Sequence, residues 1–172
     1  MAGYPMAPVN SLGLTTLGTG HTAFSLVAVA VGLYLLIRYK EISPRTLAGK
    51  VYIVTTLVTA LSGFGIFQHG GFGKPHVLGV LTVLVIGVAL AAGYTALFGK
   101  WSRYMETVSY SATFLFHLIP GVTETTTRLP AARPIFPNAD VDELKAIAGG
   151  LFLLFLAGAA LQVRALRKVS PG

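Results

Sequence analysis

The sequence contains no cysteine. This absence excludes disulfide bonds, thiolate metal ligands, cysteine nucleophiles and c-type haem attachment, so any chemistry must come from imidazole, carboxylate and hydroxyl groups. Charged side chains are also scarce, at 11% of 172 residues, whereas hydrophobic side chains make up 53% and the mean hydropathy is +0.70. Such a composition is typical of a membrane protein. The sequence therefore predicts an integral membrane protein with the lipid bilayer as its main partner.

Several familiar signatures are missing as well. No Lys or Arg precedes Arg38, so the positive region of a cleavable signal peptide is absent and we expect the N-terminus to be retained. The glycine-rich segment 68–76 lacks the Gly-Lys-Ser/Thr ending of a phosphate-binding loop. Neither a Gly-x-Ser-x-Gly elbow nor a His-Glu-x-x-His helix occurs. The absence of these motifs leaves open whether the protein is an enzyme.

Five apolar segments are long enough to cross a bilayer, which takes roughly 20 residues. They lie near 20–38, 51–69, 76–98, 105–122 and 146–166. Only the connection 123–145 is long, and its prolines argue against a continuous helix there. The sequence thus predicts an all-α bundle of five transmembrane helices. An extracytoplasmic segment, 1–19, precedes a single membrane domain, 20–172.

Lys and Arg are unequally divided between the two sides of this bundle. Nine lie on one side, and these are Arg38, Lys40, Arg45, Lys50, Lys100, Arg103, Arg164, Arg167 and Lys168. The other side has four, namely Lys74, Arg128, Arg133 and Lys145. Because cytoplasmic loops carry an excess of basic residues, we expect the N-terminus outside and the C-terminus in the cytoplasm, in a bacterial inner membrane. The net charge of +7 follows from this topology and from contact with anionic lipids, so no nucleic-acid partner is predicted.

All four histidines fall toward the extracytoplasmic side. His21 opens the first segment, His69 closes the second, His76 opens the third, and His117 lies in the outer half of the fourth. Ionisable residues near the bilayer usually face the protein interior and serve a functional site. The shared depth therefore predicts a histidine cluster.

Helical periodicity predicts which faces point inward. Four faces carry polar or small residues: His21, Ser25, Ala28 and Gly32; then Tyr52, Thr55, Thr59, Ser62 and His69; then His76, Gly79, Val83, Gly87, Leu90 and Tyr94; and last Tyr110, Thr113, His117 and Glu124. The fifth segment has Gln162 as its only uncharged polar side chain, so we expect it to be peripheral or to form an oligomer contact. An alternative interpretation is that the hydroxyls bond to their own helices and that the histidines only sit in the wet interface.

The cluster could bind a metal or a haem. Imidazole is a common ligand of zinc, copper and iron, and two facing histidines can hold the iron of haem b. We expect His69, His76 and His117 to be the ligands, with His21 as a fourth ligand or as a group supporting them. Glu124 is a candidate carboxylate ligand or general base, unless it pairs with Arg128 four residues later. The predicted role is redox chemistry or metal handling.

Part of the chain resembles a known family. The resemblance rests on the run His21 to Leu36, on Leu47-Ala48-Gly49-Lys50-Val51-Tyr52, on His76-Val77-Leu78-Gly79, and on Phe116-His117 through Thr127-Arg128-Leu129-Pro130. These elements, within residues 20–130, resemble the bacterial small multi-helix membrane proteins of the domain of unknown function 2306 family. Such proteins typically have a His-Arg pair before the second helix, where this chain has Thr46-Leu47. The resemblance implies a histidine-bearing helical bundle that binds haem or metal.

Three other functions fit the sequence. The protein could be a cofactor-free accessory or scaffold subunit of a larger membrane complex, with basic loops and small-residue faces as its contacts. A proton- or solute-conducting bundle along the stripe from Tyr52 to His69 ranks lower, because that stripe contains no acid within the membrane. A membrane hydrolase with Ser62 or Ser25 as nucleophile ranks lowest.

Overall fold

The structure is a computed structural model that describes residues 9–10, 13–66 and 72–169. Within these ranges the chain forms five α-helices and one short 3-10 helix. They are α1 (Thr16–Tyr39), α2 (Leu47–Gly63), α3 (Lys74–Tyr94), η1 (Gly99–Trp101), α4 (Ser102–Arg128) and α5 (Asp142–Val169). The predicted all-α fold with five helices is confirmed.

Three of these helices, α1, α3 and α5, are long and apolar enough to span a membrane. Their outward faces carry large exposed hydrophobic side chains such as Leu26, Leu84 and Leu153. Water would not tolerate so many exposed apolar groups, whereas lipid does. The helices therefore indicate an integral membrane protein. The shorter α2 is also apolar, whereas α4 buries a polar face inside the bundle.

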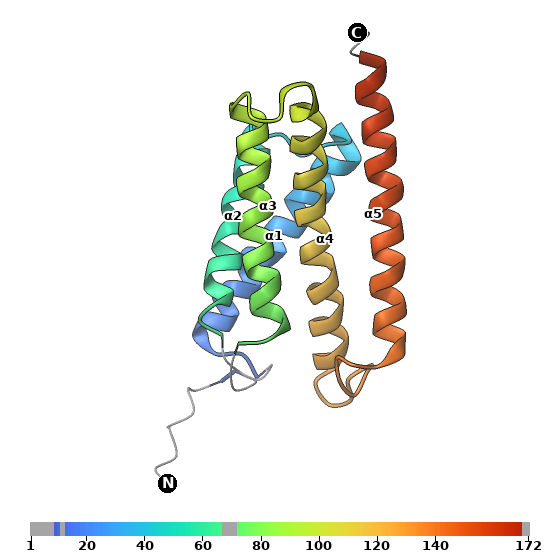
Figure 1. The fold of residues 1–172 in the computed structure, drawn as a ribbon. Coiled ribbons are helices and arrows are strands. Elements are labelled where there is room, and N and C mark those ends of the chain that lie inside the picture. Colours follow the sequence, from blue (N-terminus) through green and yellow to red (C-terminus); the bar gives the residue numbers. More distant parts are fainter. Residues whose placement is uncertain (1–8, 11–12, 67–71, 170–172) are drawn as a thin grey trace.

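Helices α1 to α4 pack into one bundle, and α5 lies along the outside of α4 (Figure 1). The connections α1–α2 (40–46) and α3–α4 (95–101) lie at one end of the bundle, together with the C-terminal part of α5. We call this the basic end. The start of α1, the end of α2, the start of α3 and the end of α4 form the opposite, histidine end. The start of α1 and the end of α5 lie at opposite ends (Figure 1).

Side-chain caps explain why several helix bounds differ from the apolar segments. Thr15 and Thr46 each accept a hydrogen bond from a backbone N–H in the first turn, so α1 and α2 begin before their apolar runs. Helix α4 continues to Arg128, where an ion pair with Glu124 supports the last turn. The long connection is therefore 129–141 and not 123–145. Helix α2 ends at Gly63, before its predicted end at His69, which lies outside the described residues.

The inward face of α3 differs from the predicted one. His76, Thr82, Ile86, Ala89 and Ala92 are buried, whereas Gly87, Leu90 and Tyr94 are exposed. From Thr82 onward the buried positions are spaced four, three and three residues apart, which is shorter on average than the 3.6 residues of a straight helix. A stripe counted from His76 at 3.6 residues per turn therefore reaches the exposed face of α3 toward its end. The predicted faces of α1 and of the buried part of α4 need no such correction.

Candidate functional site

Two of the predicted histidines meet in the interior near the histidine end. His117 of α4 is 6% exposed, and its Nε2 lies 3.1 Å from Thr56 Oγ1 of α2 while its Nδ1 lies 3.3 Å from Ser25 Oγ of α1. His21 lies one turn before Ser25 on α1, and its Nδ1 is 3.1 Å from Ser62 Oγ of α2. Imidazoles from two helices thus reach the same region, and hydroxyls from α1 and α2 hold them in place.

A second set of polar groups continues from His117 toward the basic end. Tyr52 is completely buried, and its ring meets that of His117 edge-on at a centroid distance of 6.3 Å. Its hydroxyl lies 2.8 Å from Thr113 Oγ1 of α4. Tyr110 lies about one helical turn before Thr113 on α4, toward the basic end, and is also fully buried. Within the described residues the Tyr110 hydroxyl has no hydrogen-bond partner.

The polar groups end at a buried acid. Glu106 of α4 is 2% exposed, and its carboxylate accepts hydrogen bonds from Arg45 at 2.5 Å and from Arg103 at 3.2 Å. Arg45 also donates to the Gly93 carbonyl of α3. A side chain at Gly93 would collide with the Glu106 carboxylate, so glycine is required for this approach. Arg103 binds both oxygens of Glu41 as well.

We call the whole set the polar column. Its members come from α1, α2 and α4 and are, from the histidine end to the basic end, Ser62, His21, Ser25, His117, Thr56, Tyr52, Thr113, Tyr110 and Glu106. All of them are buried or half-buried. The column therefore runs along the bundle from near the start of α1 to the start of α4.

The other candidate ligands lie elsewhere. His76 is buried at the start of α3, where its Nδ1 accepts a hydrogen bond from the Gly73 N–H at 3.2 Å and its ring stacks on Phe72. These contacts give it a local helix-capping role. Glu124 is half-exposed on α4 and accepts a hydrogen bond from Arg128 Nε at 2.6 Å, which is the predicted alternative to a ligand role. His69 lies outside the described residues.

Hydroxyl groups surround the described histidines of the column. Both ring nitrogens of His117 face hydroxyls, so a metal bound at either nitrogen would have to displace one of them. In the described part of the chain no group of three or more His, Asp or Glu side chains is placed to hold a metal ion. A neutral imidazole has one donor and one acceptor nitrogen, and a hydroxyl can complement either. The geometry therefore satisfies both ring nitrogens of His117 by hydrogen bonding.

Two important residues were not singled out by the sequence patterns. Thr56 lies beside the predicted polar stripe of α2, yet its hydroxyl contacts His117, whereas Thr55 and Thr59 bond to carbonyls of their own helix. Its position four residues after Tyr52 is the only signal that could have pointed to it. Glu106 stands among the basic residues of its end in the sequence, and no local pattern indicates that it is buried inside the bundle.

Comparison of the chain with protein-family models, curated proteins and solved structures finds no match.

Proposed function

We propose that this membrane protein conducts protons along the polar column, between the histidine end and Glu106. The observation that carries the proposal is a pair of adjacent hydrogen-bonded groups, Tyr52 with Thr113 and His117 with Thr56 and Ser25, inside a bundle whose outer surface is apolar. Buried ionisable residues in membrane helices often mark proton pathways. With the predicted orientation, the histidine end would face outward and Glu106 the cytoplasm.

Each member of the column can accept a proton on one side and release one on the other. Hydroxyls and neutral imidazole each combine a donor with an acceptor, and His117 joins two hydroxyls in this way. A proton that binds one ring nitrogen of His117 can leave from the other, which transfers it between α1 and α2.

Four gaps in the column each span one helical turn. They separate His21 from Ser25, Thr56 from Tyr52, Thr113 from the Tyr110 hydroxyl, and Tyr110 from Glu106. Side chains three or four residues apart lie on the same face of a helix, roughly 5–6 Å apart at their Cβ atoms. Water can bridge polar groups at such distances. The buried Tyr110 hydroxyl, without a partner among the described residues, is available for this contact.

Glu106 supplies the acid that the stripe on α2 lacks. Its two arginine partners are half-exposed, at 50% and 44%, so they connect the buried carboxylate to the surface of the basic end. A carboxylate that lies between the rest of the column and the surface can pass protons between them. This acid removes the reason for ranking a conducting bundle below a metal site.

The test is proton flux into liposomes that contain the purified protein. A potassium diffusion potential would drive the flux, and a pH-sensitive dye inside the vesicles would report it. Tyr52→Phe removes only the hydroxyl in the middle of the column, and we expect it to lower the flux at least about tenfold, the factor for about 1.4 kcal/mol in a barrier. Tyr34→Phe is the matched control, because Tyr34 is exposed on the outside of α1.

His117→Gln should also abolish the flux, because an amide keeps hydrogen bonds but does not take up a proton near neutral pH. A wild-type protein that leaves vesicles no more permeable to protons than empty vesicles would contradict the proposal. Equal flux in wild type and in both column variants would contradict it too. Folding of each variant is checked by its helix content and its elution as a single species in detergent.

A metal or haem b site remains the second candidate function. The observation in its favour is that His21 and His117 reach the same region from different helices, next to the end of α2. An added Cβ on Gly63, the last residue of α2, would lie 3.4 Å from the His21 ring. A site of this kind would use His21, His69 and His117, and a redox or metal-handling role would follow.

An absorption spectrum and elemental analysis of the same purified sample distinguish the two functions. A Soret band that shifts on reduction would establish haem, and stoichiometric zinc, copper or iron without that band would establish a metal centre. His69→Ala and His117→Ala should then each abolish the bound cofactor. A colourless, metal-free protein would count against this site, and a stoichiometric co-purifying protein would instead favour an accessory subunit.

A further inference from the structure

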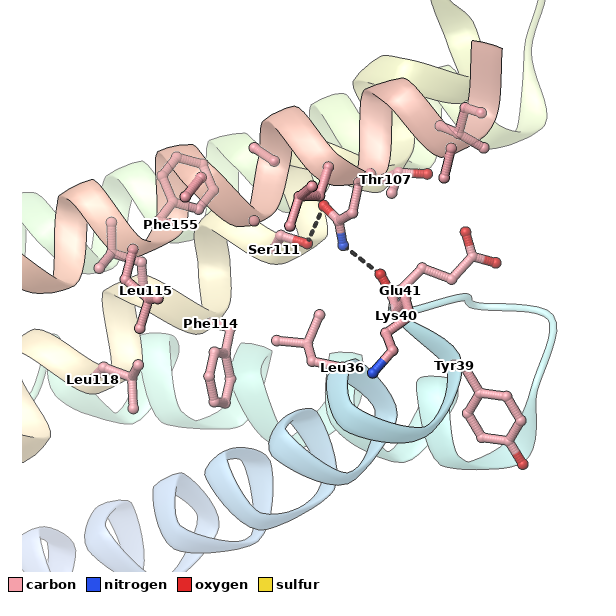
Figure 2. A pocket seen from close by; sticks show the side chains of 18 of the residues that line it. Leu36, Tyr39, Lys40, Glu41, Thr107, Ser111, Phe114, Leu115, Leu118 and Phe155 are labelled. Atoms are coloured by element: carbon pink, nitrogen blue, oxygen red, sulfur yellow. Dashed lines mark hydrogen bonds between the residues drawn. The ribbon is translucent and has the colours of Figure 1, made fainter. Parts of the chain in front are cut away.

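A groove between α1 and α5 is floored by α4 and has a volume of about 550 Å³. This size falls in the range of ligand sites, about 300–1,000 Å³. Its long part is apolar and includes Leu36, Phe114, Leu118 and Phe155. Tyr39, Lys40 and Glu41 lie at its other end (Figure 2). The groove is therefore apolar along its length and polar at the basic end.

The polar end is held together by one amide. Gln162 of α5 accepts a hydrogen bond from Ser111 of α4 at 3.0 Å and donates one to the Lys40 carbonyl at 2.6 Å (Figure 2). Beside it, the hydroxyl of Thr107 lines the groove; this residue is 1% exposed, and the hydroxyl has no hydrogen-bond partner in the described ranges. The polar end thus contains fixed polar groups as well as charge.

The charge at this end is positive. It comes from Lys40, which lies at the mouth of the groove and is exposed. The nearby Glu41 is neutralised, because Arg103 binds both of its oxygens at 2.8 and 2.6 Å. A basic pocket between membrane helices attracts an anionic headgroup.

We infer that the groove binds an anionic phospholipid, with an acyl chain between α1 and α5 and the phosphate at Lys40. Three observations support this occupant. The groove is apolar where a bilayer provides acyl chains, its polar end carries a net positive charge, and Leu154 and Leu161 in its wall are 68% and 66% exposed. The site lies on the outer side of α4, so it does not depend on the proton pathway.

Two pairs of variants test the site. Gly158 lines the groove, and an added Cβ there meets no atom within 4 Å, so we expect Gly158→Leu to fill the groove and leave the helix packing in place. Gly150→Leu is its control, because Gly150 is equally open on α5 but does not line the groove. Lys40→Asn removes the charge, and asparagine tolerates the left-handed backbone at this position, φ 63°. Lys50→Asn is the control for Lys40→Asn, because it removes a basic charge from α2 at the same end of the bundle.

The measurement uses the full chain reconstituted in vesicles of equal parts phosphatidylglycerol and phosphatidylcholine. After extraction in mild detergent, mass spectrometry counts the lipids that remain bound. We expect wild type, Gly150→Leu and Lys50→Asn to retain about one phosphatidylglycerol each. Gly158→Leu should lose this lipid. Lys40→Asn should reduce the preference for phosphatidylglycerol over phosphatidylcholine about fivefold, equivalent to about 1 kcal/mol for one basic residue.

Three results would overturn the assignment. Wild type could retain both lipids equally, which would show that the headgroup charge plays no part. Gly158→Leu could retain as much phosphatidylglycerol as Gly150→Leu, which would place the lipid elsewhere. A quinone or a second copy of the chain, found in place of the phospholipid, would show that the groove serves a different partner.

Discussion

At the scale of single residues, Glu106 shows how a charge can be kept inside this bundle. Burying an unpaired carboxylate costs several kcal/mol, and this cost falls only when the charge is paired and hydrogen-bonded. Arg45 and Arg103 provide both conditions, one for each carboxylate oxygen. The same contacts join three parts of the chain, since Arg45 follows α1 and also binds the end of α3.

Glu106→Gln should therefore lower the stability of the fold. The amide keeps the shape of the side chain but loses two charge-assisted hydrogen bonds, and we expect a loss of about 2 kcal/mol because the arginines remain partly solvated. Thermal unfolding in detergent measures this change. Asp140→Asn is the control: the Asp140–Lys74 pair is exposed at both partners, 76% and 92%, and such pairs contribute little. An equal effect of the two substitutions would contradict the structural role of Glu106.

At the scale of helices, α1 approaches α2 and α4 closely at Gly32. A Cβ added there would lie 2.7 Å from Phe114 Cδ2 and 2.7 Å from Tyr52 Cε2. Small residues allow helices to pack tightly in membranes, where dispersion forces and hydrogen bonds replace the hydrophobic effect. The position of Tyr52, and with it the middle of the polar column, thus depends on the absence of a side chain at Gly32 of α1.

Gly32→Ala is expected to destabilise the bundle by about 1–3 kcal/mol, the usual cost of overpacking a core. Gly20→Ala on the same helix should have no such cost, because a Cβ there meets no atom within 4 Å. The comparison separates the loss of space from the change in helix propensity, which is the same at both positions. Reversible unfolding in mixed micelles would measure the difference. Equal stabilities would show that α1 can move away from Tyr52 freely.

At the scale of the whole molecule, the buried acid Glu106 with its arginines and the histidines occupy opposite ends. Arg45, Arg103 and Glu106 connect elements at the basic end, while His21, His76 and Glu124 lie toward the other. Helix α5 is peripheral, as its sequence predicted, and Leu144 is its one buried side chain in the described part of the chain. A polar interior and an apolar exterior are the arrangement expected of a bundle in lipid.

The absence of cysteine makes the orientation directly testable. Leu97→Cys places a thiol in the exposed connection at the basic end, and Ala132→Cys places one in the connection between α4 and α5. In intact cells, a membrane-impermeant maleimide should label Ala132→Cys and leave Leu97→Cys unlabelled until the membrane is opened, because basic loops stay in the cytoplasm. The reverse labelling would invert the predicted topology and the direction of the polar column.

Much of the architecture could be read from the amino-acid order alone, because it depends on local properties. Apolar length separates five helices, and turn residues such as Pro44 and Gly99 mark their boundaries. Periodicity places Ala28 and Gly32 on the inward face of α1, and Tyr110, Thr113 and His117 on that of α4. These predictions succeed because a helix has a fixed rise and a fixed repeat.

The tertiary structure alone decides which inward faces meet and at what height. Thr56, and not Thr55 or Thr59, reaches His117; Glu106 enters the interior because Gly93 leaves room; and the groove beside α5 exists because α5 contacts α4 along a narrow stripe. Each of these contacts joins residues more than ten positions apart in the chain. They follow from the packing of whole helices, whose relative rotation and shift no local pattern specifies.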